Sequence, residues 1–511
     1  MMFLPQIPYT SNKVSQQVVQ FGSLHYDRGG KDGDFSETLN LSSKRYPTLS
    51  QRGARKVTAE YDHATALYAR NKLIVVDGTN FIYDGKVVGQ VSEGEKNITS
   101  VNSKVVIFPD KKYYDVEEDK FGDMEASLEV ASDKITWAAN SVTVSSPETL
   151  LDELFAVGQG IEISGSSIEA NNKTVVVLKA ESNQLTFSAN AFTAGTESNT
   201  VTIQRKVPDF TCICESANRL WGAEDETIYA SALGDPLTFF AYQGLSTDAF
   251  AVAVGTDGAF TGCIAYSSNV LFFKENALHK VLGGAPSEYR VYNYTVPGVQ
   301  AGSEKSMVVI NELLFYKGVS GVYAYSGASP SLVSENFGTR RFQHAAAGTD
   351  GTKYYISMQE EGTDAWNLFV FDPDTGVWLR EDDTHAIDFV RQDTMLHLLD
   401  AKSGDVYTVE QGTEALDWMA QFYPFDDTAY GKRGYSKLWL KLELDPGAWV
   451  KAEVSCDTGP FRQVGLWNER RETFTANIVP GRCDTFRLRL SGHGGCVVKS
   501  LVREFDVGSE R

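Results

Sequence analysis

The sequence predicts an all-β protein built around a β-propeller of about seven blades, and three observations carry the prediction. The first is composition: the 511 residues include 28 Phe, 23 Tyr and 44 Gly, whereas long amphipathic helical patterns are nearly absent. The second is a hairpin-like pattern that recurs along the chain. The third is the spacing of that pattern, which matches one propeller blade.

The recurring pattern is clearest in NVLFFKENALHKVLG, residues 269–283. A polar residue leads into an apolar run, a short turn follows, and a second apolar run ends at glycine, which is typical of a tight β-hairpin. A single hairpin of this length cannot bury its apolar face, so a series of them predicts stacked or radial sheets. The same pattern recurs in residues 71–85, 103–116, 218–232, 311–327, 352–378 and 394–409.

Residues 269, 311, 353 and 394, one in each of four successive repeats, are 42, 42 and 41 residues apart. A four-stranded propeller blade takes roughly 40–45 residues. The step from 71 to 103 is 32 residues, and the step from 103 to 218 is 115. Removing the 83 residues 124–206 reduces this longer step to 32 as well, so we expect a foreign module inserted early in the propeller.

The length of the chain indicates roughly three folding units. Residues 1–60 are polar and weakly periodic, and we interpret them as an N-terminal arm. The remaining boundaries lie where the residue composition and the apolar periodicity of the sequence change. They define a discontinuous propeller (61–123 and 207–410), an inserted β-barrel or sandwich (124–206) and a C-terminal β-sandwich (411–511).

The inserted segment is rich in Ser, Asn and Thr. In it, SSPETLLDELF (Ser145–Phe155) predicts one short helix with Ser146 as N-cap, Pro147 at the first helical position and Glu148 in the first turn. Alternating apolar pairs predict the strands that follow, at Ile161/Ile163, Val175/Val177, Leu185/Phe187 and Val201/Ile203.

The last hundred residues alternate apolar and polar positions, notably around Arg487 and Arg489. This alternation predicts sheets with one buried and one solvent-exposed face, and hence a sandwich. The apolar triplets are Leu438/Leu440/Leu442, Val450/Ala452/Val454, Phe474/Ala476/Ile478 and Phe486/Leu488/Leu490.

A basic island, LSSKRYPTLSQRGARK (Leu41–Lys56), stands out in the acidic N-terminal segment. One interpretation is an arm that docks on an acidic neighbour, such as another copy of the chain. Two alternatives stay open: solvated charges on an extended lead-in, or an outer strand that closes the propeller ring. The candidate inter-subunit residues are Lys44, Arg45, Arg52, Arg55 and Lys56.

The net charge of −20 argues against a sequence-specific DNA-binding protein, because phosphates are repelled. An acidic surface can still suit a passage through which DNA slides without sticking. The start of the chain carries no secretory pattern, and no stretch reaches the roughly 18 apolar residues of a membrane span. The six cysteines show no CxxC pairing, so we expect reduced, mostly buried thiols.

Catalytic patterns such as HExxH, GxSxG with a triad order, a Walker loop and CxxC knuckles are missing, so we expect no catalytic, metal or cofactor residues and no enzyme. Two segments were weighed as metal sites. The stretch Asp372-Pro-Asp374-Thr-Gly376 fits a calcium loop less well than a β-turn, which needs the same residues. A second cluster fits solvated loops better than a divalent ion; it comprises Asp382, Asp383, His385, Asp388 and His397.

Four aromatic residues that could stack on sugars fit core packing better. They are Tyr113, Tyr114, Trp221 and Tyr229. Trp378, in the Kelch-like stretch FDPDTGVW, likewise fits core packing better than a partner site. The stretch CDTGPFRQVG (Cys456–Gly465) is faintly similar to the Asp-box hairpins of sialidases, but it lacks the full pattern and stands outside the expected propeller.

Three stretches resemble the β-propeller tail proteins of tailed bacteriophages, which include packaged-DNA stabilisation, tail-hub and nozzle proteins. They are NLSSKRYPTLSQRGAR (Asn40–Arg55), TGCIAYSSNVLFFKENALHKVLGG (Thr261–Gly284) and PGRCDTFRLRLSGHGG (Pro480–Gly495). These three stretches, at the start, middle and end of the chain, are motifs of structure and not of catalysis. The insert at 124–206 and the terminal sandwich depart from the best-known members.

The resemblance implies a homo-oligomeric ring, commonly of six copies, below the portal and adaptor, which holds the genome and conducts it during ejection. Its partners would be portal, adaptor and other tail proteins and passing double-stranded DNA, and it would reside in the virion tail after assembly in the host cytoplasm. Two other functions stay open. One is a glycan-binding or glycosidase-like propeller for receptor recognition, and the other is a Kelch-like interaction scaffold.

Overall fold

A computed structural model describes residues 13–27, 29–147, 149–425, 432–479 and 482–507 of the chain. These residues form 48 β-strands, so the predicted all-β fold class is confirmed. Of the stretches interpreted above, residues 1–12 at the chain start, Glu148 in the expected helix, and Pro480 and Gly481 lie outside the described residues. Helical structure in the described residues is confined to α1 (Leu151–Leu154) and the 3-10 turns η1 (Glu169–Asn171), η2 (Glu304–Ser306) and η3 (Glu335–Phe337).

Nine sheets in the described residues are four-stranded and antiparallel, and the seven that lie outside the insert have the form of propeller blades. Each of the first six is built from strands consecutive in the chain. In order they are β6 (Ala64–Arg70), β7 (Lys72–Asp77), β8 (Asn80–Tyr83), β9 (Lys86–Gln90); β10 (Asn97–Val101), β11 (Lys104–Phe108), β12 (Lys112–Asp115), β13 (Lys120–Asp123); β22 (Cys212–Ser216), β23 (Arg219–Glu224), β24 (Thr227–Ala230), β25 (Phe250–Ala253); β26 (Gly262–Tyr266), β27 (Asn269–Lys274), β28 (Ala277–Leu282), β29 (Arg290–Tyr294); β30 (Val308–Ile310), β31 (Leu313–Gly318), β32 (Gly321–Tyr325), β33 (Ser331–Leu332); and β34 (Phe342–Thr349), β35 (Tyr354–Glu360), β36 (Trp366–Asp372), β37 (Val377–Asp382).

The seventh blade takes its outer strand from the start of the chain. Its order is β38 (Ala386–Gln392), β39 (Met395–Asp400), β40 (Val406–Gly412), β5 (Ala54–Ala59). In the β40–β5 pair, Tyr407 lies opposite Val57 and Thr408 opposite Lys56. The interpretation that part of the basic island supplies a closing outer strand is therefore confirmed.

The predicted hairpins form the two middle strands of the blades, as in β27–β28 and β31–β32. The polar residue that opens the pattern has a structural reason. Asn71, Asn218 and Asn311 lie in the turn before the second strand of their blades, with φ of 61°, 58° and 47°. Asn tolerates this left-handed backbone better than most residues, so it recurs at these turns.

The chain divides into two compact units. Unit 1 comprises Met1–Glu60, Ser320–Ala324 and Ser331–Arg511, and unit 2 comprises Tyr61–Val319 and Tyr325–Pro330. Within unit 2, the first strands of successive blades are neighbours, β6 with β10, β10 with β22, and β22 with β26. Within unit 1, β34 lies beside β38 in the same way. First strands that succeed one another around an axis are the arrangement of propeller blades.

Apolar side chains fill the space between neighbouring blades in each unit. Such packing lets blades that are each too thin to exclude water bury their faces against one another. Representative members are Phe81 and Ile107 between the first two blades, Phe108 and Leu220 between the second and third, Trp221 and Phe272 between the third and fourth, and Leu368 and Leu398 between the sixth and seventh.

The C-terminal sandwich combines strands from both ends of the chain. Its seven-stranded sheet has the order β3 (Leu41–Ser42), β4 (Leu49–Gln51), β48 (Cys496–Val507), β42 (Arg433–Leu444), β45 (Thr473–Asn477), with β1 (Lys13–Val18) on β48 and β46 (Arg482–Cys483) on β42. Its five-stranded sheet has the order β2 (Phe35–Leu39), β41 (Asp417–Phe422), β47 (Phe486–His493), β43 (Trp449–Cys456), β44 (Arg462–Trp467).

The burial of the sandwich strands alternates as the sequence predicts. In β43, Val450, Ala452 and Val454 are fully buried, whereas the residues between them are half-buried. The described part of residues 1–60 is not a separate arm, however, and that interpretation is wrong. Its strands β1 to β4 pair within the sandwich sheets and β5 pairs within the last blade, because short strands shared between sheets leave no continuous pattern to read.

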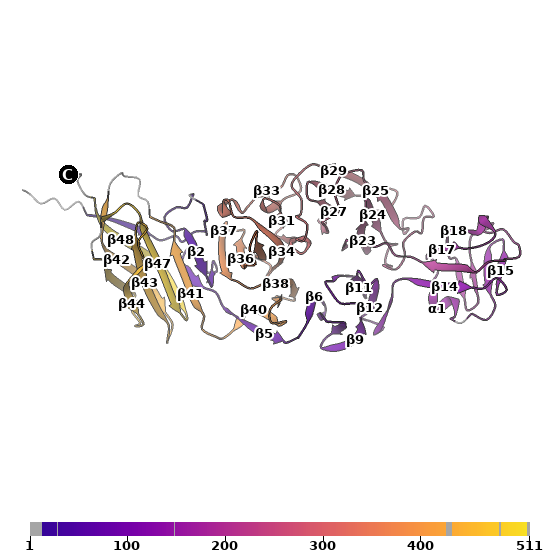
Figure 1. Ribbon diagram of the computed structural model, residues 1–511, viewed down its shortest axis with the longest axis horizontal. Coiled ribbons are helices and arrows are strands. Elements are labelled where there is room, and N and C mark those ends of the chain that lie inside the picture. Colours follow the sequence, from indigo (N-terminus) through magenta and orange to yellow (C-terminus); the bar gives the residue numbers. More distant parts are fainter. Residues whose placement is uncertain (1–12, 28, 148, 426–431, 480–481, 508–511) are drawn as a thin grey trace, which may run out of the picture. The chain divides into compact units, whose positions relative to one another are not determined.

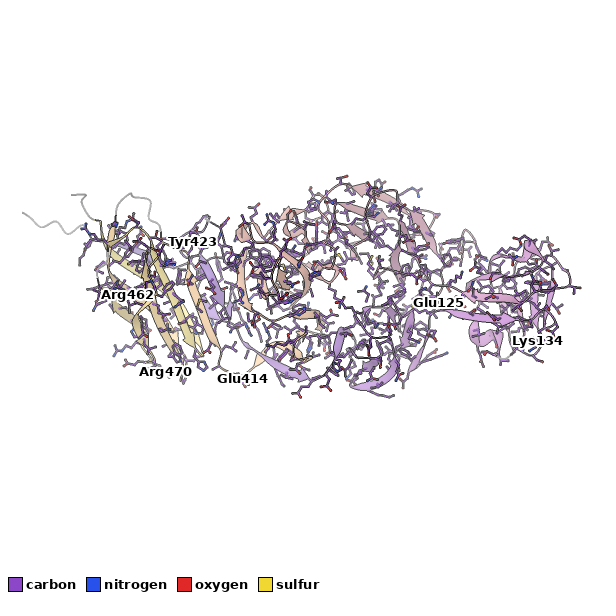
Figure 2. The ribbon with its side chains drawn as sticks, viewed as in Figure 1. Glu125, Lys134, Glu414, Tyr423, Arg462 and Arg470 are labelled. Atoms are coloured by element: carbon purple, nitrogen blue, oxygen red, sulfur yellow. The ribbon has the colours of Figure 1, made fainter. Side chains whose placement is uncertain are left out.

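The insert folds as two four-stranded sheets around one core (Figure 1). Trp137, Ile161, Leu185 and Ile203 are among the buried residues of this core. The sheets have the orders β14 (Ala126–Val130), β21 (Val201–Arg205), β17 (Gly160–Ser164), β18 (Lys173–Val176) and β15 (Ile135–Ala138), β16 (Ser141–Val144), β20 (Gln184–Thr186), β19 (Lys179–Glu181). In Figure 2, Glu125 lies where the chain enters this module and Lys134 lies within it.

The helix predicted at Ser145–Phe155 is much shorter than expected. Only Leu151–Leu154 are helical, and the residue before them, Leu150, makes no capping side-chain hydrogen bond. Ser146 is not an N-cap, since its φ of 51° places it in a left-handed turn. Leu151, the first residue of this short helix, is fully buried in the insert core, and the backbone on either side of the helix, at Leu150 and Phe155, is extended.

Candidate functional site

The five basic residues singled out in the N-terminal segment have different surroundings. Lys44 is 71% exposed and pairs with Glu410 at 3.0 Å, and Arg45 and Lys56 are exposed. Arg52 and Arg55 are buried, with side chains 6% and 10% exposed. The sequence therefore grouped residues that the fold separates into a surface set and an interior set.

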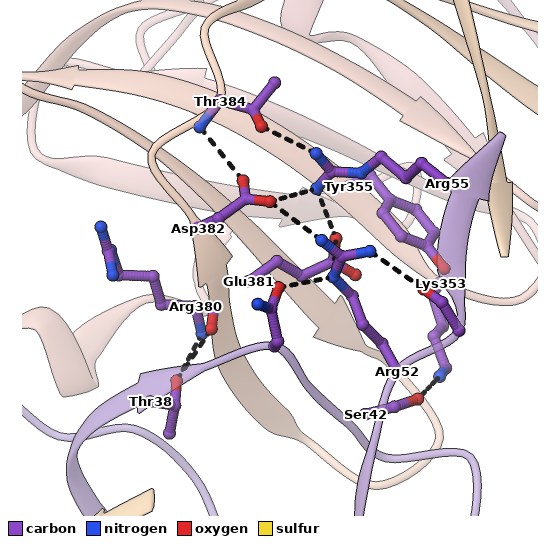
Figure 3. A network of polar contacts seen from close by, with 12 residues as sticks. Thr38, Ser42, Arg52, Arg55, Lys353, Tyr355, Arg380, Glu381, Asp382 and Thr384 are labelled. Atoms are coloured by element: carbon purple, nitrogen blue, oxygen red, sulfur yellow. Dashed lines mark hydrogen bonds and ion pairs between the residues drawn. The ribbon is translucent and has the colours of Figure 1, made fainter. Parts of the chain in front are cut away.

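The interior set forms a buried ion network in unit 1, drawn in Figure 3. Arg55 Nη2 lies 2.7 Å from Glu381 Oε2 and 3.0 Å from Asp382 Oδ2. Arg52 Nη2 lies 3.0 Å from the same Asp382 oxygen, and Arg52 Nε lies 3.3 Å from Glu381 Oε2. Two guanidinium groups therefore share two carboxylates at the end of β37, beside the closing strand β5.

Hydrogen bonds add further partners to the network. Arg55 Nη1 donates to Thr384 Oγ1 at 2.7 Å (Figure 3), and Arg52 Nε donates to Asn40 Oδ1 at 2.9 Å. The backbone N–H of Thr384 donates to Asp382 Oδ1 at 3.1 Å. Such additional partners are what allow charges to be buried without a prohibitive loss of hydration.

The pKa values of the network follow from these contacts. Burial by itself would lower the pKa of Arg55, but the carboxylates of Glu381 and Asp382 outweigh it and raise that pKa above its ordinary value. Burial would raise the pKa of Asp382, yet Arg55 and Arg52 lower it below its ordinary value. The contacts therefore favour the charged forms of Arg55 and Asp382, and the ion pairs tie the closing strand to the end of β37.

The expectation that Arg52 and Arg55 contact another subunit is wrong, because both side chains are used inside their own chain. Their burial could not be read from a basic stretch, since their partners lie more than 300 residues away. Arg45 and Lys56 are exposed and remain candidates for contact with another subunit. Lys44 also remains a candidate, although it already pairs with Glu410 of its own chain.

The stretch Asp372–Gly376 is the turn between β36 and β37. The N–H of Gly376 donates to the Asp372 carbonyl at 2.8 Å, and the N–H groups of Asp374 and Thr375 donate to Asp372 Oδ1. Gly376 has φ of 71°, a conformation that favours glycine. The Oγ of Ser43 donates to the other Asp372 oxygen at 2.6 Å, so the carboxylate serves the turn.

The cluster of acids and histidines that follows is dispersed. Asp382 belongs to the ion network, and the ring of His385 stacks on Trp366 with centroids 3.4 Å apart. His397 is 5% exposed, its Nδ1 lies 3.0 Å from Thr408 Oγ1, and burial lowers its pKa. Within the described part of the chain, no group of three or more His, Cys, Asp or Glu is placed to hold a metal ion.

Three of the aromatic residues considered in the sequence lie in the interior of the protein. Tyr114 is 3% exposed, and its hydroxyl donates to Asp119 Oδ1 at 2.7 Å. Trp221 is 2% exposed, and its ring packs on the ring of Tyr289. Trp378 is fully buried, and its indole N–H donates to the Val333 carbonyl at 2.8 Å. The core interpretation is confirmed for these three residues.

The sequence gives no indication of the most heavily hydrogen-bonded carboxylate of the insert, Glu197. It is 5% exposed and accepts from Trp137 Nε1 at 3.1 Å, from the Ser166 hydroxyl at 2.6 Å and from the Ser167 N–H at 2.7 Å. The six cysteines are free thiols, of which Cys456 alone is only partly buried. Among the described residues no helix could span a membrane.

Comparison with family models found no match, and neither did comparison with curated proteins. Solved structures with some similarity include the computationally designed Ika8 protein, 13% identical at TM-score 0.35 over 70% of this chain and 99% of its own. BamB from Moraxella catarrhalis is 11% identical at TM-score 0.33, over 70% of this chain and 97% of its own. PorZ, a surface component of the type-IX secretion system of Porphyromonas gingivalis, is 10% identical at TM-score 0.28, over 88% of this chain and 71% of its own.

These TM-scores lie below 0.5, so the similarities carry no argument about function. The class of protein follows from the sheets themselves. The chain is an all-β protein with a β-propeller of seven four-stranded blades among its described residues, an inserted small β domain and a C-terminal β-sandwich.

Proposed function

We propose that this chain is a structural virion protein of a bacteriophage tail. In this role it forms an oligomeric ring, as hub or nozzle, that retains the packaged DNA and conducts it during ejection. The chain works by assembly and not by turnover: rigid propellers act as wedges, and one side of each copy meets the opposite side of the next.

The observation that carries the proposal is the way unit 1 is closed. The described residues before Tyr61 supply the outer strand of the last blade and strands of both sandwich sheets, and the buried ion network fixes this outer strand. Strands paired in this way resist separation, because opening the sheets requires hydrogen bonds to break along the length of each strand. The three resembling sequence phrases and the net charge of −20 agree with a DNA conduit.

Native mass measurement together with negative-stain imaging of the purified protein tests the proposal. We expect an integral multiple of the 56.3 kDa chain mass and rings of identical copies. Antibodies against the chain should label the tails of particles that contain it. A chain that stays monomeric at high concentration and is missing from tails would contradict the proposal.

The exposed basic residues Arg45 and Lys56 offer a test of the contact between copies. We expect the double variant Arg45→Glu, Lys56→Glu to weaken the ring and raised ionic strength to loosen the unmodified one, because exposed charge pairs are screened by salt. Lys402→Glu, an exposed charge reversal in the β39–β40 turn, is the matched control. Rings indifferent to both changes would remove these residues from the interface.

The alternative of a glycan-binding or glycosidase-like propeller requires exposed aromatics and a carboxylate pair at the propeller mouth. Burial of Tyr114 and Trp221 weighs against it. A turnover assay on polysaccharide separates it from the tail proposal, and a monomer that captures a protein partner would instead favour the Kelch-like scaffold.

A further inference from the structure

A hollow of about 560 Å³ opens on the C-terminal sandwich, over the last two strands of its five-stranded sheet. Strand β44 forms its edge; in Figure 2 it begins at the labelled Arg462, and the labelled Arg470 lies in the segment after it. The hollow belongs to unit 1 alone. It is lined by Gly447, Ala448, Trp449, Lys451, Gln463, Leu466 and Asn468.

The lining of this hollow faces away from the sandwich core. Val450 and Ala452 are fully buried, so their neighbours Trp449 and Lys451 point to the opposite face of the strand. Leu466 lies directly opposite Lys451 across the β43–β44 pair, and Gln463 lies opposite Glu453. Residues opposite one another share a face, so these side chains lie on the solvent side of the sheet.

One part of the lining is apolar. Trp449 is half-buried, and Leu466 is 57% exposed although it is a large hydrophobic residue. The turn before β43 is open: Gly447, which also lines the hollow, has φ of 84°, and a Cβ placed there would meet no atom within 4 Å. An aromatic ring with open space beside it can receive the C–H face of a flat ligand.

The other part of the lining is polar and largely uncharged. The carboxamides of Gln463 and Asn468 are exposed, and each offers N–H donors and a carbonyl acceptor. Lys451 contributes the only charge, and its Nζ already lies 3.2 Å from Glu453 Oε1. A concave site that combines an aromatic platform with a few convergent polar groups is typical of small-molecule recognition.

This combination selects among ligand classes. A fatty acid would leave both carboxamides facing a chain that offers no hydrogen bonds, which is unfavourable. A phosphate would meet a single ammonium group whose charge is already balanced by Glu453. A neutral sugar has an apolar C–H face and hydroxyl groups that both donate and accept, so it matches the two parts of the lining.

We propose that this hollow is a carbohydrate-binding site for a neutral hexose unit, with Trp449 as the stacking platform and Gln463 and Asn468 as hydrogen-bonding groups. The inference is independent of the tail function, because one chain contains the whole site. Full-length protein therefore tests it whatever its oligomeric state.

The experiment titrates the full chain with the methyl glycosides of glucose, galactose, mannose and N-acetylglucosamine, by saturation-transfer NMR and calorimetry. We expect at least one sugar to bind with a dissociation constant on the order of 1 mM, the range of a ligand with about a dozen heavy atoms. Trp449→Ala should weaken binding about tenfold, and Gln463→Ala about fivefold.

Trp439→Ala is the matched control, because Trp439 is a half-buried tryptophan on β42 of the other sandwich sheet. It should bind sugar like the unmodified protein, and thermal unfolding should show that each variant is folded. The proposal is overturned if all four sugars bind with dissociation constants well above about 1 mM or do not bind at all, or if Trp449→Ala and Trp439→Ala behave alike. Binding of inorganic phosphate or dodecanoate in place of sugar would overturn it as well.

Discussion

At the scale of single residues, Glu197 shows how one buried carboxylate organises a module. Hydroxyl and backbone donors from Ser166 and Ser167 converge on it, and the indole N–H of Trp137 reaches it across the core. Burial alone would raise its pKa, but the hydrogen bonds from Ser166, Ser167 and Asn199 outweigh burial and lower the pKa to about 2. The charged form is therefore built into the fold of the insert.

The lowered pKa predicts how the insert responds to acid. A carboxyl whose folded pKa is depressed contributes stability above its ordinary value of 4.5, and this contribution is lost as the pH falls toward 2. Hydrogen–deuterium exchange of insert peptides should thus show progressive loss of protection across this window. Protection that is unchanged down to pH 2 would contradict the assignment.

Glu197→Gln should destabilise the insert by about 2 kcal/mol, because it removes a buried charge that accepts several hydrogen bonds. The variant should also flatten the acid response described above. Chemical denaturation followed by exchange of the same peptides measures both effects. Glu181→Gln is the control: Glu181 forms an exposed pair with Lys179, so we expect a change within about 0.5 kcal/mol.

At the scale of elements, strand β5 determines how the last blade is completed. It pairs with β40, and its Arg55 is held by Glu381 at the end of β37. An unpaired β40 edge would offer free backbone groups to other chains. The ion network thus stabilises the one strand whose loss would open that edge.

Glu381→Ala should lower the free energy of unfolding of unit 1 by about 3 kcal/mol or more, because it leaves Arg52 and Arg55 buried with a single shared carboxylate. Thermal and denaturant unfolding measure this change. Lys44→Ala removes an exposed pair with Glu410 and should cost less than about 1 kcal/mol. Equal, small effects of the two substitutions would show that the network contributes nothing to closure.

At the scale of the whole molecule, the excess of 67 acidic over 47 basic residues disfavours binding to DNA phosphates. Phosphate binding draws its affinity from counterion release at basic groups, and a chain of net charge −20 offers little of it. A conduit for DNA needs this property, because a lumen that bound phosphates would hold the genome back.

Linear duplex DNA should show no mobility shift with the purified protein even at about 50 mM salt, where non-specific binding is strongest. A shift that weakens as salt is raised would reveal a basic binding surface and contradict the proposed passive passage. A basic DNA-binding protein run in parallel verifies that the assay detects such binding.

The repeating part of the fold could be predicted because its rules are local. Apolar alternation, turn residues such as Asn71 and Asn311, and a spacing of about 42 residues are all contained in short windows of sequence. The same holds for the sandwich strands, where Leu438 and Leu440 alternate with polar neighbours. The helix predicted within Ser145–Phe155 is confirmed only at Leu151–Leu154, because the backbone at Leu150 and Phe155 is extended and no side chain caps the first turn.

The sequence by itself therefore determined the fold class, the hairpins and the division of the insert and the sandwich from the propeller. Only the tertiary structure decided that residues before Tyr61 belong to sheets completed near the chain end, that Arg52 and Arg55 are interior, and that Trp449 borders a hollow with Gln463. The physical reason is the distance along the sequence over which each interaction acts. Strand alternation and turns act between neighbours in the chain, whereas strand partners, ion pairs and surface hollows join residues tens to hundreds of positions apart.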